Sequence, residues 1–259
     1  MYAPLTKEPY NVPILSTNRR SAEMIKYASN DFLALKISYI NEIANLCEKL
    51  GANIQDVSKG MGYDARIGNK FLNAGIGYGG SCFPKDTKAL HWLSVQSGVE
   101  LKTVKACIEV NKAQKIRLFE KLKSDLTTLK NVNVAVLGLT FKPGTDDLRE
   151  APSIDNIELL LDVGANIRAF DPISIESFQK KISYKFENDG VTGTITYFDN
   201  IDDAIRGADA ALIMTEWPEI KEYNIEKYKK LMKTPRVYDG RNCYDLKDTK
   251  DIIYKSIGR

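Results

Sequence analysis

The residue whose type and neighbours best suit covalent chemistry is Cys82. It follows a loop with four glycines in six residues, and Pro84 and Lys85 predict that a helix begins there. A thiolate at a helix N-terminus beside a lysine is stabilised by the helix dipole and by the cation. This arrangement favours a nucleophilic cysteine over a buried structural thiol. A structural thiol is favoured for the other cysteines, Cys47, Cys107 and Cys243.

The loop before Cys82 contains the spacing Gly-x-Gly-x-x-Gly, formed by Gly75, Gly77 and Gly80. In a dinucleotide-binding fingerprint this spacing follows a strand and opens a helix, whereas here it lies between two predicted helices. The sequence therefore does not predict a Rossmann phosphate loop at this point. The glycines could form a backbone cradle for an anion or a nucleotide. They could also belong to a flexible loop, and composition alone leaves both readings open.

The segments around this loop predict an all-α unit over residues 16–130. Apolar residues recur at helical spacing from about Ser21 to Leu50, and Gly51 follows as a stop signal. Such a helix would be about 45 Å long, which suits a scaffold or a dimerisation surface. Shorter helices are predicted over 54–61, 85–97 and 101–129. The prolines at 4, 9 and 13 predict an extended, irregular segment over 1–15 with no helix.

From Asn131 onward, short apolar strands alternate with helices. This alternation predicts a doubly wound, Rossmann-like parallel sheet over residues 131–259, so the chain as a whole is placed in the α/β class. The expected strands are 132–138, 167–170, 194–197, 210–214, 236–238 and 252–254. The expected helices are 153–163, 174–181, 201–206 and 219–232.

Composition narrows the functional classes. The net charge is 37 − 34 = +3, and the basic residues are scattered among acidic ones, so a nucleic-acid partner is not expected. No apolar run reaches the roughly 18 residues of a membrane span, and the N-terminus lacks the pattern of a secretory signal. Widely spaced cysteines and the single histidine, His91, favour a reduced, cytoplasmic protein without a metal site.

Residues 77–86 read Gly-x-Gly-Gly-Ser-Cys-x-x-Lys-Asp, which resembles the active-site motif of the UDP-glucose dehydrogenase family. Segments 22–30, 64–68, 138–150 and 239–241 are also similar to that family, in the same order. The resemblance therefore spans almost the whole chain. The related GDP-mannose and UDP-N-acetylmannosamine dehydrogenases usually have a histidine before the cysteine. Serine at that position, Ser81, favours UDP-glucose, and the two related substrates remain the alternatives.

The resemblance implies an NAD-dependent oxidation of a primary alcohol to a carboxylate in two hydride transfers. Cys82 would form a thiohemiacetal and then a thioester, which water hydrolyses. Lys26 and Asn30 lie four residues apart on one helix face, and by resemblance they would stabilise the oxyanion. Without the resemblance they would be read as ordinary surface residues. Asp86 would assist the proton and water chemistry.

The resemblance also implies a substrate site and a cofactor site. Lys26 and Arg66 would contact the UDP-sugar, with Arg66 reaching the neighbouring subunit of a homodimer built on the helix over 21–50. Lys85 and Arg149 would contact NAD. The remaining substrate-binding residues would be Phe71, Leu72, Asn73, Ala74, Gly75, Gly79, Lys142 and Arg241.

The chain differs from the family in one large feature, a domain that is not found in it. Family members begin with a Rossmann domain that carries a true Gly-x-Gly-x-x-Gly fingerprint, and no such domain is found in these 259 residues. We therefore expect the chain to be part of a longer enzyme and to have negligible activity alone. The alternative for the chain itself is a non-catalytic module for dimerisation and nucleotide-sugar binding.

Overall fold

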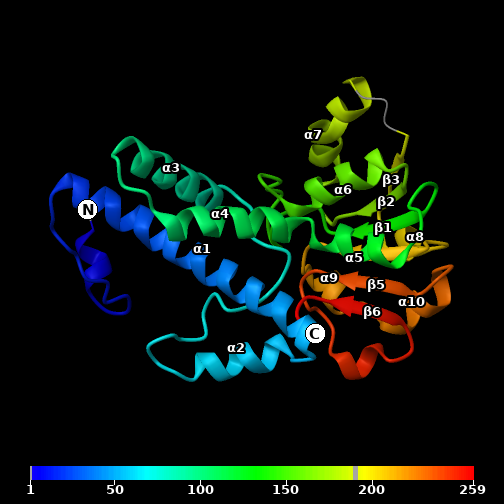
Figure 1. The fold of residues 1–259 in the computed structure, drawn as a ribbon, viewed down its shortest axis with the longest axis horizontal. Helices are drawn as coiled ribbons and strands as arrows, with labels where there is room; N and C mark the ends of the chain where they lie inside the picture. The colour runs from blue at the N-terminus through cyan, green and yellow to red at the C-terminus, as the bar shows by residue number, and fades with distance from the viewer. Residues whose placement is uncertain (1, 189–191) are drawn as a thin grey trace.

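The computed structural model describes residues 2–188 and 192–259. Met1 of the expected N-terminal segment and residues 189–191 of the expected sheet region lie outside the described residues. The long helix α1 (Arg19–Leu50) runs diagonally through a helical part, and a parallel sheet with its helices forms the other part (Figure 1). Among the described residues, no helix is long and apolar enough to span a lipid bilayer.

Both ends of α1 have the capping interactions that its sequence encodes. The side chain of Asn18 accepts a hydrogen bond from the N–H of Ser21 at 2.9 Å, and Gly51 ends the helix in the left-handed conformation at φ 71°. The expected long helix is therefore confirmed, with its start two residues earlier than predicted. Helices α3 (Cys82–Gln96) and α4 (Lys102–Lys115) pack along α1, and α2 (Ile54–Gly62) follows its C-terminal end (Figure 1).

Two expectations for the helical part are wrong. The single helix expected over 101–129 is divided, because α4 ends at Lys115 and α5 (Arg117–Asp125) begins after Ile116. The apolar spacing continues across this break, so periodicity alone did not show it. Residues 1–15 also contain a short 3-10 helix, Ala3–Thr6, because Pro4 sits in its first turn, where a missing N–H costs nothing.

The sheet contains six parallel strands in the order β3-β2-β1-β4-β5-β6. This order is that of a doubly wound dinucleotide-binding fold, so the α/β fold class is confirmed. The strands are β1 (Asn133–Leu137), β2 (Asn166–Phe170), β3 (Thr194–Tyr197), β4 (Ala210–Ile213), β5 (Arg236–Asp239) and β6 (Ile253–Ser256).

Helices cover both faces of the sheet. Side chains along β1 alternate between these faces, so successive residues belong to two different cores. Val134 and Val136 join one core with α5, α6 (Pro152–Asp162) and α7 (Ile175–Asn188). Ala135 and Leu137 join the other core with α8 (Ile201–Ile205), α9 (Pro218–Lys221) and α10 (Ile225–Leu231). The single helix expected over 219–232 is wrong, because Asn224 caps a new helix at Ile225. The short 3-10 helix Leu246–Thr249 precedes β6.

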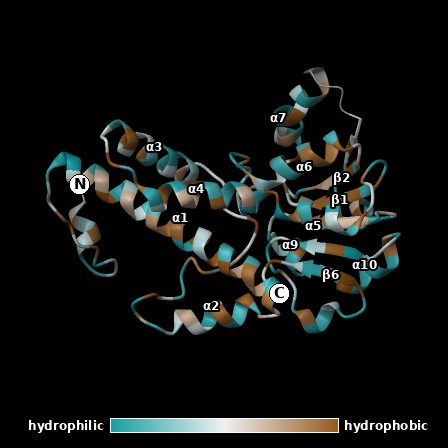
Figure 2. Cartoon of the chain, viewed as in Figure 1, coloured by the Kyte–Doolittle hydropathy of each residue, from teal (hydrophilic) through white to brown (hydrophobic). Residues whose placement is uncertain are grey.

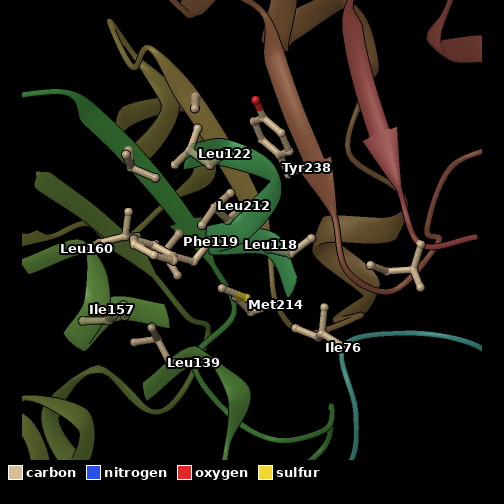
Figure 3. Close-up of a cluster of buried hydrophobic side chains, with 14 of the residues drawn as sticks. Ile76, Leu118, Phe119, Leu122, Leu139, Ile157, Leu160, Leu212, Met214 and Tyr238 are labelled. Carbon is tan, nitrogen blue, oxygen red and sulfur yellow. The ribbon is translucent and has the colours of Figure 1, made fainter. Parts of the chain in front are cut away.

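Helix α5 joins the two parts of the chain. Its Leu118 and Leu122 are fully buried, and they pack with residues of β4, β5 and α6 (Figure 3). Ile76, from the glycine loop, belongs to the same core. The loop is therefore anchored to the sheet by buried apolar contact. The division of the chain at residue 130 stays a prediction.

Candidate active site

Cys82 is the first residue of α3 and is exposed. The helix therefore begins three residues before the predicted range of 85–97, with Pro84 inside its first turn. This position puts the thiol at the positive end of a 15-residue helix. The other cysteines are buried or partly buried, and all four are free thiols.

Asp86 lies one turn after Cys82 and is fully buried. Its Oδ2 accepts hydrogen bonds from the ammonium of Lys26 and, at 2.6 Å, from the amide of Asn30. Lys85 Nζ lies 3.2 Å from the other carboxylate oxygen. Burial alone would raise the pKa of Asp86, but these three partners lower it below its usual value.

Lys26 and Asn30 reach the same carboxylate because they lie one turn apart on α1, which packs directly against α3. The hydrogen bond to Asp86 raises the pKa of Lys26, and a negative charge at Cys82 would raise it further. The structure thus brings Cys82, Lys26, Asn30 and Asp86 together, with Lys85 beside them. A cation, an amide donor and a carboxylate next to an exposed thiol can stabilise an oxyanion and move a proton.

A pocket of about 1190 Å³ is lined by the glycine loop, and none of Cys82, Lys26, Asn30 and Asp86 is among its lining residues. Arg241, which follows β5, reaches it from the sheet part of the chain. Phe83, next to Cys82, lines it from α3. The other expected substrate residues that line it are Phe71, Leu72, Asn73, Ala74, Gly75 and Gly79.

The glycines of the loop are required by close contact with the sheet part of the chain. A Cβ on Gly75 would lie 2.9 Å from the carbonyl oxygen of Gly240, and one on Gly79 would lie 2.4 Å from that of Glu150. The N–H of Gly75 donates to Asn41, and the N–H of Gly80 donates to Arg149. These two N–H groups bind acceptors within the chain, so the fold holds the loop in place, and a backbone cradle for a ligand stays a prediction.

Glu150, in the segment between β1 and α6, forms ion pairs with the helices of the other part of the chain. Its carboxylate binds Lys88 of α3 at 2.7 Å and Lys115 of α4 at 2.8 Å. Burial works against this charge, but the two lysines lower the pKa of Glu150 to about 2. The helix that carries Cys82 is therefore tied by charge to the segment after β1.

Arg241 bridges the pocket and both parts of the chain. Its guanidinium donates to the carbonyls of Met214 at 2.9 Å and Gly77 at 3.1 Å, and it lies 3.2 Å from Glu216. A guanidinium has five N–H donors, so these contacts leave donors for an anionic ligand. It follows the carboxyl end of β5, and ligands bind outside the carboxyl ends of the strands in this class of sheet.

The other expected site residues lie outside the pocket lining. Arg66 is exposed and binds Asp64 at 2.6 Å within its own loop. Lys142 is exposed, with its ammonium 5.4 Å from the centre of the Phe141 ring. Arg149 is exposed and binds Asp147, and its charge acts on Cys82.

Sequence reasoning missed several charged residues that line the pocket. Lys59 comes from α2, Lys70 from the following loop and Lys221 from the end of α9, while Glu216 follows β4. Each is an isolated charge in the sequence, and only the fold brings them to one cavity. Three lysines and Arg241 against one glutamate give the lining an excess of positive charge. Among the described residues, no group of three or more potential metal-ligating side chains is found.

Comparison with known proteins connects this site to one family. Residues 20–113 match the central domain of the UDP-glucose/GDP-mannose dehydrogenase family, and residues 135–246 match its UDP binding domain. The chain is 45% identical over 254 residues to UDP-glucose 6-dehydrogenase TuaD of Bacillus subtilis, covering 97% of the chain and 53% of that relative. It is 43% identical to UDP-glucose 6-dehydrogenase of Rickettsia felis, covering 98% and 55%.

Solved structures of nucleotide-sugar dehydrogenases also resemble the chain. A UDP-glucose dehydrogenase from Pyrobaculum islandicum superposes with a TM-score of 0.82 at 34% identity, covering 96% of this chain and 53% of that one. A UDP-D-ManNAc dehydrogenase from Pyrococcus horikoshii gives a TM-score of 0.75 at 28% identity, covering 94% and 53%. The chain spans about half the length of the relatives it matches. With both of its matched segments drawn from one family, the chain belongs to the UDP-glucose/GDP-mannose dehydrogenase family.

Proposed function

We propose that the chain is the nucleotide-sugar-binding and nucleophile-bearing part of an NAD-dependent UDP-glucose 6-dehydrogenase. The observation that carries this proposal is the position of Cys82. It lies exposed at the start of α3, one turn before Asp86, which binds Lys26 and Asn30, and its neighbour Phe83 lines a large pocket with an excess of cationic side chains. The UDP of the substrate would occupy the pocket, with its sugar toward Cys82.

The residues support a stepwise oxidation at the sugar's primary alcohol. Loss of a hydride and a proton gives an aldehyde, and the Cys82 thiolate then adds to its carbon. The carbonyl oxygen becomes an oxyanion, which Lys26 and Asn30 would stabilise. Loss of a second hydride leaves a thioester. Asp86 would orient the water that hydrolyses it, releasing the carboxylate and the thiol.

Two NAD⁺ molecules, bound one after the other, would supply the hydride acceptors for the two oxidations. Lys85 and Arg149 present exposed cations that are not part of the pocket lining, and cations of this kind suit a pyrophosphate. The turn after β1 reads Gly138-Leu139-Thr140 and lacks the glycine spacing of a dinucleotide fingerprint. The sheet of this chain is accordingly assigned to the UDP moiety, and the 259 residues alone are expected to bind substrate without turning it over.

We also propose a homodimer through α1. Hydrophobic residues recur along the length of this helix (Figure 2), and four exposed ones are spaced seven residues apart: Ile25, Phe32, Tyr39 and Leu46. A seven-residue apolar repeat on one face is the pattern of a helix that packs against another helix. Arg66, which does not reach the pocket of its own chain, would reach that of the partner subunit. The proposal assigns the reaction to the cytoplasm, where Cys82 would stay reduced.

Calorimetry on the 259-residue chain tests the proposal. We expect UDP-glucose to bind with release of heat and GDP-mannose to bind more weakly, because residues that match a UDP binding domain contribute to the pocket and Ser81 precedes the cysteine. With UDP-glucose and NAD⁺ together, no formation of NADH is expected. If UDP-glucose does not bind at millimolar concentration, the chain has only a structural role. If NADH forms robustly, the chain is sufficient for catalysis.

A further inference from the structure

A second pocket lies where the end of α1 meets the C-terminal segment of the chain (Figure 1). Its volume is about 410 Å³, and ligand pockets are roughly 300–1,000 Å³ in size. The residues around it come from the end of α1, the turn before α2, α5 and the C-terminal segment. They include Glu48, Asn53, Lys121, Leu246, Lys255 and Arg259. None of its lining residues lines the larger pocket, and the proposed reaction uses none of them.

Positive charge is in excess in the second pocket. Three cations line it: Lys121, Lys255 and Arg259. Of the described residues, Glu48 alone supplies a carboxylate to the lining. That carboxylate is already shared, because Lys121 lies 2.7 Å from its Oε1 and Arg117 lies 3.0 Å from its Oε2. Glu48 therefore does not balance the other two cations of the lining.

The two lysines keep N–H donors that a ligand could use. An ammonium has three such donors. Lys121 uses two of them, on Glu48 and on the carbonyl of Ser256, so one remains among the described contacts. Lys255 uses one, on Asp125, so two remain. Asp125 itself lies outside the pocket lining.

The guanidinium of Arg259 is held in place by neutral groups. It donates to Gln55 Oε1 at 2.9 Å and to the carbonyl of Tyr244 at 2.6 Å. Its other acceptors are the hydroxyls of Ser256 and Tyr254. Because these four acceptors among the described residues carry no charge, the positive charge of Arg259 stays uncompensated. One of the five N–H donors of the guanidinium also remains.

Two further features favour an anion in this pocket. Helix α2 begins directly after the lining residue Asn53, and the N-terminus of a helix attracts negative charge. Burial lowers the pKa of Lys121, and the positive charges of Arg117 and Lys255 lower it further, although Glu48 acts in the opposite direction. An anion beside Lys121 would relieve this repulsion between cations.

The chemistry of the lining selects a phosphate group. A phosphate offers several acceptor oxygens at once, and lysine and arginine are the side chains that bind it. The pocket also has room for more than a phosphate, and Leu246 adds an apolar side chain to its lining. We propose that the second pocket binds a small molecule that carries a phosphate group, with Lys121, Lys255 and Arg259 holding the phosphate. This site is additional to the one proposed for UDP-glucose.

Calorimetry on the 259-residue chain tests the site, with inorganic pyrophosphate as the probe. Gln55, which accepts a hydrogen bond from Arg259, also lines the larger pocket, so the larger pocket is first saturated with UDP. We expect pyrophosphate still to bind, and Lys255→Ala to weaken its binding about ten-fold. Glucose 6-phosphate, titrated in the same way, distinguishes an organic phosphate from a free one, and glucose is the uncharged control.

A nearby lysine supplies the matched control. Lys247 is 73% exposed, belongs to the short helix before β6 and does not line the pocket. Lys247→Ala removes the same charge from the same segment and should leave the binding of pyrophosphate unchanged.

A footprint on the wild-type chain repeats the test without any variant. Pyrophosphate should slow the acylation of Lys255 by an N-hydroxysuccinimide ester several-fold and leave that of Lys247 unchanged, as mass spectrometry of the modified peptides would show.

Three results would overturn the inference. Pyrophosphate might be displaced by UDP, it might bind Lys255→Ala as tightly as the wild type, or it might fail to bind at millimolar concentration. The first would place it in the larger pocket. If UDP itself does not bind, the proposed function fails instead, and the footprint on Lys255 still decides whether the second pocket takes a phosphate.

Discussion

Replacing Arg241 with alanine is expected to weaken the binding of UDP to the chain by about 30-fold, or about 2 kcal/mol. The guanidinium is held in place by the carbonyls of Met214 and Gly77. It projects from the carboxyl end of β5, where a diphosphate would lie in a sheet of this topology. Calorimetric titration of the variant with UDP measures the loss.

Arg241→Ala also removes contacts between the two parts of the chain, so a control must separate binding from folding. Arg241→Lys keeps the charge but loses the forked geometry, and it should recover part of the affinity. Arg236→Ala removes an arginine from the other end of β5 and should bind UDP like the wild type. If Arg241→Ala binds UDP normally while its thermal midpoint falls, the residue joins the two parts of the chain and does not contact phosphate.

The double variant Phe32→Asp, Tyr39→Asp is expected to convert a dimer into a monomer. Phe32 is 62% exposed, although a large aromatic side chain gains most from burial. It lies two helical turns away from Tyr39 on the exposed stripe of α1. Two charges at the centre of an apolar helix interface would have to be desolvated without partners. Sedimentation at tens of micromolar should show half the mass of the wild type.

The same change at an unrelated exposed aromatic residue supplies the matched control. Phe186→Asp alters α7, on the sheet side of the chain, and should leave the dimer intact. Circular dichroism should show that the double variant keeps its helices, since both replaced side chains are exposed in the single chain. If the wild-type chain is already a monomer at this concentration, the proposed dimer through α1 is wrong.

The long helix and the strands could be predicted because local sequence determines them. Gly51 supplies the left-handed stop of α1, and the strands are short apolar runs bounded by polar residues. The breaks at Ile116 and before Asn224 were missed for different reasons. The first lies inside an unbroken apolar period, because α4 faces α1 and α5 faces the sheet. The second had a readable signal, since Asn224 is a strong N-cap residue.

The covalent part of the site could be anticipated from residue types, but its surroundings could not. Cys82 beside Lys85 at a helix start already predicts a reactive thiol, and the four-residue spacing of Lys26 and Asn30 puts both on one face. Nothing local links them to Asp86, which they meet only because α1 packs on α3.

The role of the glycines changed most between sequence and structure. Composition suggested either a flexible loop or a cradle of N–H donors. In the fold, backbone and side chains of the sheet part press against Gly75 and Gly79, and a Cβ at either position would collide with a carbonyl oxygen. The glycines therefore allow the two parts of the chain to approach closely, and the pocket forms where they meet.

The most direct test of the central claim is protection of Cys82 by substrate. The 259-residue chain is treated with a limiting amount of iodoacetamide, with and without saturating UDP-glucose, and each cysteine peptide is quantified. We expect Cys82 to react first of the four thiols, since it alone of the four is exposed, and we expect UDP-glucose, but not glucose, to slow its reaction several-fold. Equal reaction of Cys82 with and without UDP-glucose would contradict a sugar site at this thiol.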